Sequence, residues 1–575
     1  MFEKFEKLVF DGIQSSFKRK VVLFATLIAF ILSVLMIAPT KLVLAKMLPG
    51  KNNDTFTIYT TLPKGSSIEQ TKGVCECVAD KLKQEKNITD FEMFLGMGAP
   101  LDFAGLIKGS QFKNSENVAE IVVNITKKHD RDEPSYFMVQ RIRPGIQQTC
   151  QSMVDGTTIS FIEPPAGPPV LAAIVAEIYG RDASGIRELS QRVAEVFKKT
   201  DGLVDVEIMQ DAIYDTFEII ANSDKVSRSG IDLKQLNDIL YLAFEGMDIA
   251  VKNSDMFNDQ IPIFLTLSRE SKKFNTKDLS SVKAKLSSLK MMNMQGMMIP
   301  MTELVEIVAK KSNPMIMSKE LHQMVNVMAE TDMVSQVYPL MEARDTIVDS
   351  FSDKYEIEKT GLFDLKLTDK NSGESYKLVW DGEMKVTLDT FAELGAAFIA
   401  ALVLIFLLMV VYYKSYTLSG IILLGSFLSI IGVIVGHFIM DLFSHDTFFL
   451  TATSLIGFIA LIGISSRNSL LLIDFSASLM RDCGYTKAKA IAFATATRAK
   501  PIFLTAAAII LASTLLASDA VFGGLGVALI FGTIAAVVAS LVVVPVLMYQ
   551  ADLERHFNLK GATPKNEACE IHTNN

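Results

Sequence analysis

The sequence lacks the residue spacings that mark common catalytic and metal-binding sites. No GxxxxGK[ST] phosphate-binding loop and no GxSxG nucleophile turn is present, and the six histidines form no HExxH pair. The five cysteines show no zinc spacing and predict no disulfide framework, because Cys75 and Cys77 point different ways on a predicted helix and the other three are isolated. We therefore expect a protein that is not an enzyme, that binds no metal or cofactor and that does not use ATP.

An excess of positive charge is also absent. Lysine and arginine number 56 against 64 aspartates and glutamates, which gives a net charge of −8 and argues against nucleic acid as a partner. Half of the residues are hydrophobic and the mean hydropathy is +0.31, yet 21% are charged. This composition predicts a membrane part joined to a large soluble part.

Six long apolar stretches organise the chain. The first, residues 21–39, follows an amphipathic segment, residues 1–20, and has no small-residue cleavage site behind it, so we expect a retained membrane helix and not a signal peptide. The other five are long enough to cross a bilayer at about 1.5 Å per residue. They cover residues 392–413, 418–439, 448–475, 501–517 and 521–549.

Basic residues indicate the orientation of these helices. The segments 1–20 and 550–575 and the connections at 414 and 481–500 contain lysine or arginine, whereas the connections at 441–446 and 517–519 contain none. By the positive-inside rule, both termini are predicted to be cytoplasmic, and the long loop at 40–391 is predicted to lie on the other side of the membrane.

The long loop alternates between strand and helix patterns. Residues 54–62, 118–125 and 203–209 are typical of strands, and 187–199 has the apolar stripe of a helix. Ser66 and Glu69 have the spacing of a capping box at the start of another helix, and the proline-rich run 164–169 is a natural linker. These patterns predict several α+β units with antiparallel sheets.

Charged residues inside the fourth apolar stretch are the candidate functional residues. Arg467 and Asn468 lie well within it and Asp474 lies near its end. An arginine in hydrocarbon costs at least about 2.5–3.5 kcal/mol, so we expect Arg467 to face other helices and to have a polar or anionic partner. For Asp474, an interfacial cap or ion pair is the preferred interpretation.

Arg498 and Thr505, seven residues apart near the start of the fifth stretch, share one helix face. If the two helices are neighbours, a polar strip of Arg467, Asn468, Arg498 and Thr505 can run between them, although Arg498 and Lys500 also fit simple membrane anchors. No Asp or Glu lies in the middle of any of the six stretches. A proton path therefore needs an acidic group from another polypeptide.

The chain resembles the carboxyl-terminal half of a resistance–nodulation–division (RND) efflux permease of the hydrophobe/amphiphile type. The resemblance rests on GISSRNSLLLIDF at 463–475, TRAKPIFLT at 497–505 and GGLGVALIFGTIAAVVASLVVVPVLMY at 523–549, together with 48–67 and 380–395. The order of one helix, a long loop and five helices also agrees. Lys500 departs from the family pattern, where a second arginine is common at this position.

The resemblance implies a fold and a mechanism. It implies a six-helix membrane domain and an α+β periplasmic domain of ferredoxin-like (βαβ) porter subdomains. It places Arg467 opposite two aspartates of an amino-terminal half, with Arg498 and Thr505 as relay residues. The function implied is export of amphiphilic or hydrophobic compounds driven by the proton gradient.

The resemblance also divides the chain and implies its partners. The first porter subdomain is expected at about 51–170, the second at 171–216 plus 315–385, and a docking insertion at 217–314. The expected location is the bacterial inner membrane. The expected partners are an amino-terminal permease half or full-length protomers in a trimer, a periplasmic adaptor protein and an outer-membrane channel.

Three other interpretations stay open. A protein-export subunit similar to SecD also has six helices and a large loop after the first. An inactive fragment of an interrupted permease has the same sequence features as a working half. The methionine-rich run 291–298 suits copper(I) or silver(I), and hence a metal exporter half, although a hairpin turn with packed flanking methionines is the preferred interpretation.

Overall fold

A computed structural model of the chain describes residues 2–37, 40–164, 167–256, 260–272, 278–332, 335–361, 363–444, 447–551 and 553. The linker residues Pro165 and Ala166, Asp446 of the 441–446 connection, and the tail from 554, with Cys569, lie outside the described residues. The chain forms two compact units, Met1–Met209 with Met317–Asn575, and Gln210–Ile316.

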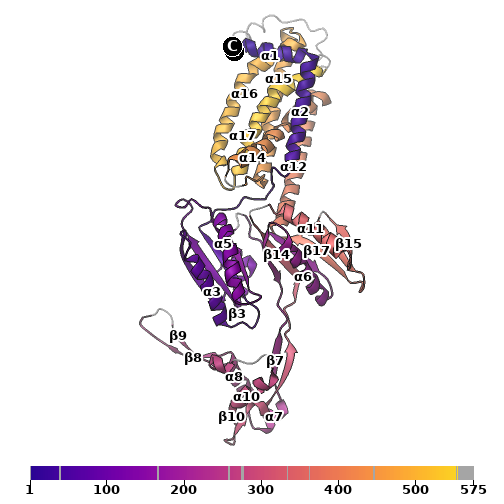
Figure 1. Cartoon of the computed structure of the whole chain (residues 1–575). Helices are drawn as coiled ribbons and strands as arrows, with labels where there is room; N and C mark the ends of the chain where they lie inside the picture. Colours follow the sequence, from indigo (N-terminus) through magenta and orange to yellow (C-terminus); the bar gives the residue numbers. More distant parts are fainter. Residues whose placement is uncertain are drawn as a thin grey trace. The chain divides into compact units, whose positions relative to one another are not determined.

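The six predicted membrane helices are confirmed in the described part of the chain, and each is 22 to 31 residues long (Figure 1). Their lengths exceed the roughly 20 residues that a bilayer requires. They are α2 (Ser16–Ile37), α12 (Glu383–Tyr413), α13 with α14 (Tyr416–Phe427 and Ser429–Phe443), α15 (Ala452–Asp482), α16 (Lys487–Ala517), and α17 with α18 (Gly523–Val538 and Val544–Gln550).

Several helices extend beyond their predicted stretches. The prediction of 501–517 covers only the second half of α16, because the polar residues from Lys487 onward lower the local hydropathy without ending the helix. A π-helical turn at Ala539–Val543 joins α17 to α18. The N-terminal segment forms the amphipathic helix α1 (Phe2–Gln14), whose Val9 and Ile13 are buried against the inner bundle.

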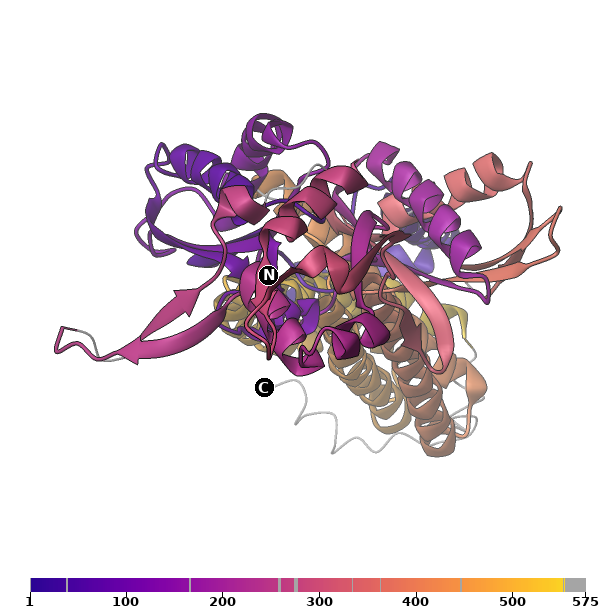
Figure 2. The same cartoon turned by 90° about the horizontal axis from the view of Figure 1, so that it is seen from below.

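The first α+β subdomain, residues 55–164, contains an antiparallel sheet with the strand order β2-β3-β1-β4. Helices α3 (Ile68–Leu82) and α5 (Ser135–Cys150) lie next to each other against one face of this sheet (Figures 1 and 2). The strands are β1 (Thr55–Thr61), β2 (Ile88–Met97), β3 (Asn114–Ile125) and β4 (Thr158–Ile162).

The predicted capping box at the start of α3 is wrong by one residue. Ser67, not Ser66, is the N-cap, and its hydroxyl accepts a hydrogen bond from the backbone of Gln70, whose side chain in turn accepts from the Ser67 backbone. Glutamine therefore takes the place expected for Glu69, which is equally compatible with a capping box.

The second α+β subdomain, residues 174–209 and 317–381, contains one larger antiparallel sheet with the order β13-β14-β5-β17-β16-β15, and β6 also pairs with β14. Helices α6 (Ala183–Lys199) and α11 (Val337–Phe351) cover it, and Phe197 stacks on Trp380 in its core. The strands are β5 (Ile174–Tyr179), β6 (Leu203–Met209), β13 (Met317–Lys319), β14 (His322–Thr331), β15 (Tyr355–Thr360), β16 (Asp364–Asp369) and β17 (Ser375–Asp381).

The unit Gln210–Ile316 is inserted between β6 and β13. It contains the strand pair β7 (Asp215–Ala221) with β12 (Val305–Lys311), and helices α8 (Leu233–Phe244) and α10 (Leu279–Ser288). The strands β10 (Lys290–Met292) and β11 (Met298–Pro300) confirm the predicted methionine hairpin. Met291 is buried, whereas Met294 at the turn is 90% exposed.

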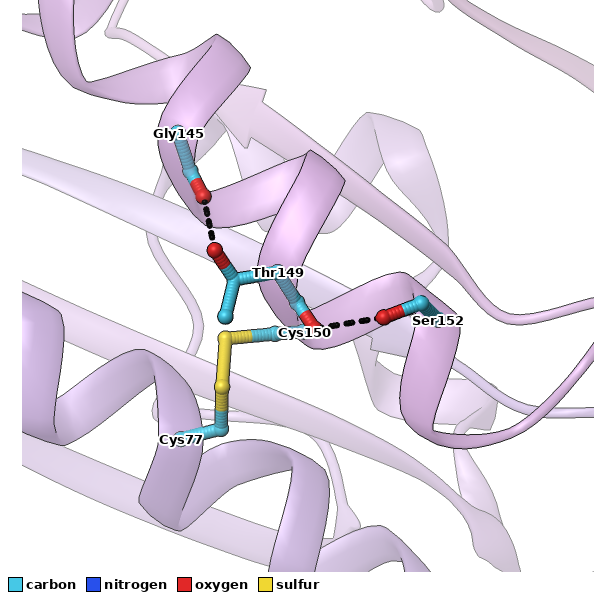
Figure 3. Close-up of a disulfide and its surroundings, with 5 residues drawn as sticks. All are labelled: Cys77, Gly145, Thr149, Cys150 and Ser152. Atoms are coloured by element: carbon cyan, nitrogen blue, oxygen red, sulfur yellow. Dashed lines mark hydrogen bonds between the residues drawn. A yellow bond between two sulfur atoms is a disulfide. The ribbon is translucent and has the colours of Figure 1, made fainter.

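A disulfide joins the two helices of the first subdomain, so the expectation of no cysteine framework is wrong for one pair. Cys77 of α3 is bonded to Cys150 at the end of α5 across 73 residues of sequence (Figure 3). Cys150 is fully buried, and the adjacent Thr149 donates its hydroxyl to the Gly145 carbonyl. The pairing is invisible in the sequence because it depends on how α3 and α5 pack.

We predict that replacing Cys77 and Cys150 with alanine destabilises the first subdomain. In the chain-entropy model, releasing a loop of this length costs about 4 kcal/mol. The measurement is limited proteolysis of the full chain against temperature, with cleavage sites mapped by mass spectrometry. In the double variant, the protease should cleave within residues 55–164 at a lower temperature than within the membrane helices. Equal susceptibility of variant and wild type would show that the disulfide is dispensable.

Candidate functional site

Helix α15 has one exposed face along the membrane bundle. Ile456, Ala460, Gly463, Arg467 and Leu471 are all exposed, and their spacing of three or four residues places them on one side of the helix. The other side of α15 is buried against neighbouring helices of the chain. The exposed side therefore forms a continuous surface, called here the α15 face, that consists of these five residues.

Arg467 lies at the middle of the α15 face. Its side chain is exposed, so the other helices of this chain do not cover it, and the expectation that it faces other helices stays a prediction. In the described part of the chain its guanidinium has no hydrogen-bond or ion-pair partner. Its sequence neighbour Asn468 lies about 100° further around the helix and is 5% exposed. The two residues therefore point in different directions.

Asp474 has a hydrogen-bond partner on another helix. The Tyr413 hydroxyl at the end of α12 donates to Asp474 Oδ1 at 2.8 Å. This hydrogen bond joins α12 to α15, and it is neither the cap nor the ion pair that the sequence analysis preferred for Asp474. Other carboxylates of the six helices, in the residues described, are Glu383, Asp389 and Glu393 near the start of α12, Asp441 near the end of α14 and Asp482 at the end of α15.

Arg498 of α16 lies against α15. Its guanidinium carbon is 4.8 Å from the centre of the Phe475 ring, a cation–π distance. Its Nε is buried and has no hydrogen-bond partner among the described residues. The contact shows that α15 and α16 are neighbours, as the predicted polar strip requires.

Thr505 does not complete a strip between these two helices. Its side chain is exposed, and its hydroxyl donates to the carbonyls of Pro501 at 3.1 Å and Ile502 at 3.0 Å. Back-bonding of this kind to the carbonyls three and four residues earlier is common for threonine within helices. The structure thus separates exposed Arg467 and Thr505 from buried Asn468, and the relay roles of Arg467, Asn468, Arg498 and Thr505 stay predictions.

A buried polar network that the sequence analysis missed joins α14, α15 and the turn before α17. His437 is fully buried, with Nδ1 2.8 Å from the Val433 carbonyl and Nε2 2.8 Å from Ser454 Oγ. A carbonyl can only accept, so Nδ1 bears the proton of the neutral ring, and Nε2 accepts from the Ser454 hydroxyl. Thr451 and Thr453 continue the network to the Val521 carbonyl.

No cluster of histidine, cysteine or acidic side chains that could hold a metal is found in the described residues. The methionines of the β10–β11 hairpin point mostly into solvent, with Met292, Met297 and Met298 between 56% and 62% exposed. Two polar features of the membrane helices therefore stand out among the described residues. One is the unpaired Arg467 on the α15 face, and the other is the buried network around His437.

Six membrane-spanning helices with a large α+β insertion after the first define a multi-pass membrane protein of transporter architecture. The model of the AcrB/AcrD/AcrF family matches residues 1–552 of the chain. The chain belongs to this family of RND efflux transporters, which are not enzymes.

Individual relatives agree with this assignment. The chain is 21% identical over 523 residues to the swarming motility protein SwrC of Bacillus subtilis (strain 168), which covers 88% of this chain and 43% of that protein. It is 21% identical over 512 residues to the multidrug resistance protein MdtC of Yersinia pseudotuberculosis serotype O:1b, with 87% and 46% covered. The chain thus spans about half the length of these relatives.

Solved structures of a heavy metal efflux pump in two crystal forms have the same fold. The TM-scores are 0.71 and 0.70 at 17% and 16% sequence identity, and the alignments cover 96% of this chain and 52% of the pump chain. These similarities confirm the RND-like fold of six long apolar helices with an antiparallel α+β domain.

We predict that Gly524→Ala destabilises the bundle. A Cβ at this position would overlap the hydroxyl oxygens of Thr451 and Ser454, which hold the network together. Overpacking of a buried site typically costs about 1–3 kcal/mol. Gly420→Ala on α13 is the matched control, because a Cβ there meets no atom within 4 Å. Thermal unfolding of the detergent-solubilised chain is the measurement; equal melting of the two variants would contradict the close packing at Gly524.

Proposed function

We propose that this chain is one half of a proton-driven RND exporter of amphiphilic compounds. The observation that supports the proposal best is the unpaired Arg467 on the α15 face. A lipid-facing arginine is expensive, and intramembrane ionisable residues mark ion pathways as a rule. The second half, on this or on another polypeptide, covers the α15 face and contributes acidic groups opposite Arg467.

The composition of the α15 face supports close helix packing. Ala460 and Gly463, on the turns before Arg467, are small, and a Cβ at Gly463 meets no atom of this chain within 4 Å. Small residues let helix backbones approach closely in a membrane. A partner helix against Ala460 and Gly463 brings its own side chains to Arg467.

The coupling step is a change in the charge opposite Arg467. With its carboxylate partners ionised, the guanidinium is held by charge-assisted hydrogen bonds. When a carboxylate binds a proton, this attraction weakens and the two halves shift, which is a local electrostatic event with a global effect. Arg498, which packs on Phe475 of α15, extends the polar path toward the cytoplasmic side, where the proton leaves. Buried Asn468 and exposed Thr505 join this path only through groups that the second half contributes.

The orientation places the α+β subdomains outside the cytoplasm. Basic residues mark both ends of the chain as cytoplasmic, and the Cys77–Cys150 disulfide supports the same orientation independently. Disulfides persist in oxidising compartments and are rare in the cytosol. We infer a bacterial inner-membrane location with a large periplasmic loop.

Family resemblance supports the proposed substrate and assembly. MdtC is a multidrug resistance protein by name, and the solved structures of similar fold are two crystal forms of a heavy metal efflux pump, so the names of the relatives indicate different substrates. Amphiphilic compounds suit this chain better than metal ions, because most methionines of the β10–β11 hairpin are more than half exposed and do not line a buried site. The assembly proposed is a trimer with a periplasmic adaptor and an outer-membrane channel.

We predict that Arg467→Ala abolishes proton-coupled efflux by the complete transporter in cells, because it removes the charge that responds to protonation. Arg467→Lys keeps the charge and should retain part of the activity, and Thr505→Ala should impair efflux less, since water can replace a hydroxyl. The measurement is efflux of a fluorescent amphiphilic dye at matched protein abundance.

Arg481→Ala is the control for this experiment, because Arg481 is an exposed arginine on the last turn of the same helix and pairs with Asp482. It should leave efflux unchanged. Full dye efflux by Arg467→Ala would refute the proposed coupling role. Loss of silver or copper tolerance without any change in dye efflux would identify a metal ion, and not an amphiphilic compound, as the substrate.

A further inference from the structure

The two α+β subdomains meet at a contact that contains several buried charges. Arg143 of α5, in the first subdomain, is 7% exposed and lies between two carboxylates of the second. Its Nε is 3.3 Å from Asp205 Oδ2, and its Nη1 is 2.9 Å from Asp332 Oδ1. This contact, defined by Arg143, Asp205 and Asp332, is called here the subdomain seam.

Asp205 has an unusual backbone conformation, and its carboxylate accepts hydrogen bonds from the first subdomain. It lies on β6 with φ of +52°, in the left-handed region that non-glycine residues rarely adopt. Its carboxylate, 1% exposed, accepts from the Phe161 backbone N–H at 3.0 Å and from Gln147 Nε2 at 2.7 Å. All of these donors belong to the first subdomain, so the Asp205 carboxylate is buried only while the subdomains are docked.

A second pair of charges flanks the seam. Lys108, at the end of α4 (Phe103–Lys108), donates to Glu330 Oε1 of β14 at 2.9 Å and to the Leu171 carbonyl at 2.6 Å. Glu330 Oε2 accepts from the Ala173 backbone. Lys108 and Glu330 therefore pair across the same contact, and Lys108 also attracts the nearby Glu207 carboxyl group.

Glu163 of the first subdomain is a carboxyl group next to the subdomain seam whose hydrogen bonding is incomplete. It follows β4 and lines a cavity of about 170 Å³ together with Lys46, Lys108, Tyr136, Glu330 and Glu383. Its Oε1 is buried and has no hydrogen-bond partner among the described residues. The groups that act on it are Arg143 and Ser135 of α5, Arg131, Lys46 and Glu330.

Counting charges shows why Glu163 is the group that takes up a proton. Arg143 gives the largest attraction on Glu163, but it is one cation and its guanidinium is shared with Asp205 and Asp332. Burial raises the pKa of Glu163 to about 7, because desolvation outweighs the attraction of Arg143 and Lys46 and the bond from Ser135, and Glu330 adds repulsion. Burial likewise raises the pKa of Asp205.

We propose that Glu163 is a proton-binding site whose protonation is coupled to docking of the two α+β subdomains through Arg143. In the docked state, Asp205 and Asp332 occupy Arg143, and Glu163 holds a proton. When the second subdomain moves away, Asp205 and Asp332 leave with it. Arg143, which stays beside Glu163 in the first subdomain, then pairs with Glu163, and Glu163 releases its proton to solvent.

The sign of the pH dependence follows from this exchange of partners. The pKa of Glu163 is about 7 in this docked structure, and the proposal returns it toward the ordinary carboxyl value of 4.5 when the subdomains separate, so docking takes up a proton between these values. Protonation therefore favours docking; the effect is complete below about pH 4.5 and is lost as the pH rises through 7. By linkage, the docking constant should be about thirtyfold larger at pH 5.5 than at pH 8.

The inference goes beyond the proposed function and needs no transport for its test. The full chain in lipid nanodiscs is labelled with spin labels on noncanonical amino acids at the exposed positions Glu92 of β2 and Glu356 of β15, which leaves the disulfide intact. Pulsed electron–electron double resonance then measures the distance between the two spin labels, one on each subdomain. The wild type should show one short distance at pH 5.5 and gain a longer component at pH 8.

Variants separate the role of Glu163 from a general effect of pH. Glu163→Gln mimics the protonated group, so the short distance should persist at both pH values. Asp205→Asn frees Arg143 for Glu163 and should shrink the pH response, which provides a second test if the Glu163 variant does not fold. Glu133→Gln, which removes a surface partner of Arg141 in the same subdomain, should respond as the wild type does.

Two results would overturn the inference. One is a wild-type distance that does not change between pH 5.5 and pH 8. The other is a Glu163→Gln variant with the full wild-type response, which would assign the pH effect to other groups. Neither result bears on Arg467, whose test measures dye efflux, so the two proposals fail independently.

Discussion

The free-energy cost of an unpaired charged side chain within the bilayer is the constraint on which the rest of this structure depends. Arg467 lies on an otherwise apolar helix, and no group in the described part of the chain pairs with it. Elsewhere in the bundle, Asp474 bonds to Tyr413 and His437 is bonded on both nitrogens, and Arg498 packs on Phe475, although its Nε has no hydrogen-bond partner among the described residues. The α15 face differs because its cation is exposed, as expected for a surface that another helix covers.

The α+β part handles charge in a different way. Some of its charges are buried within one subdomain, as Glu120 and Glu177 are, and others lie between the two subdomains, where Arg143 and Lys108 meet Asp205, Asp332 and Glu330. Buried ion pairs add little stability, because desolvation offsets their attraction, but removing one partner is costly. Such a contact favours two discrete states, docked and undocked. Proton binding at Glu163 gives this contact a response to pH that is separate from the event proposed at Arg467.

The sequence predicts those features that depend on local pattern. Apolar runs of membrane length predict all six helices, and alternation predicts β6 at its observed bounds, 203–209. Features that depend on tertiary packing are not predictable in this way. The Cys77–Cys150 bond requires α3 and α5 to be adjacent, and the exposure of Arg467 depends on which side of α15 the other helices cover. The His437–Ser454 bond joins residues that only bundle packing brings together.

Photo-crosslinking from the α15 face tests the central claim most directly. A photoreactive amino acid at position 463 fits without a clash in this chain, and position 515 on α16, where Leu515 is 81% exposed, is the control. In membranes of cells that express the complete transporter, position 463 should crosslink to a peptide from a helix with acidic residues, and position 515 should yield lipid adducts. Lipid adducts alone at position 463 would show that the α15 face has no protein partner and would contradict the account.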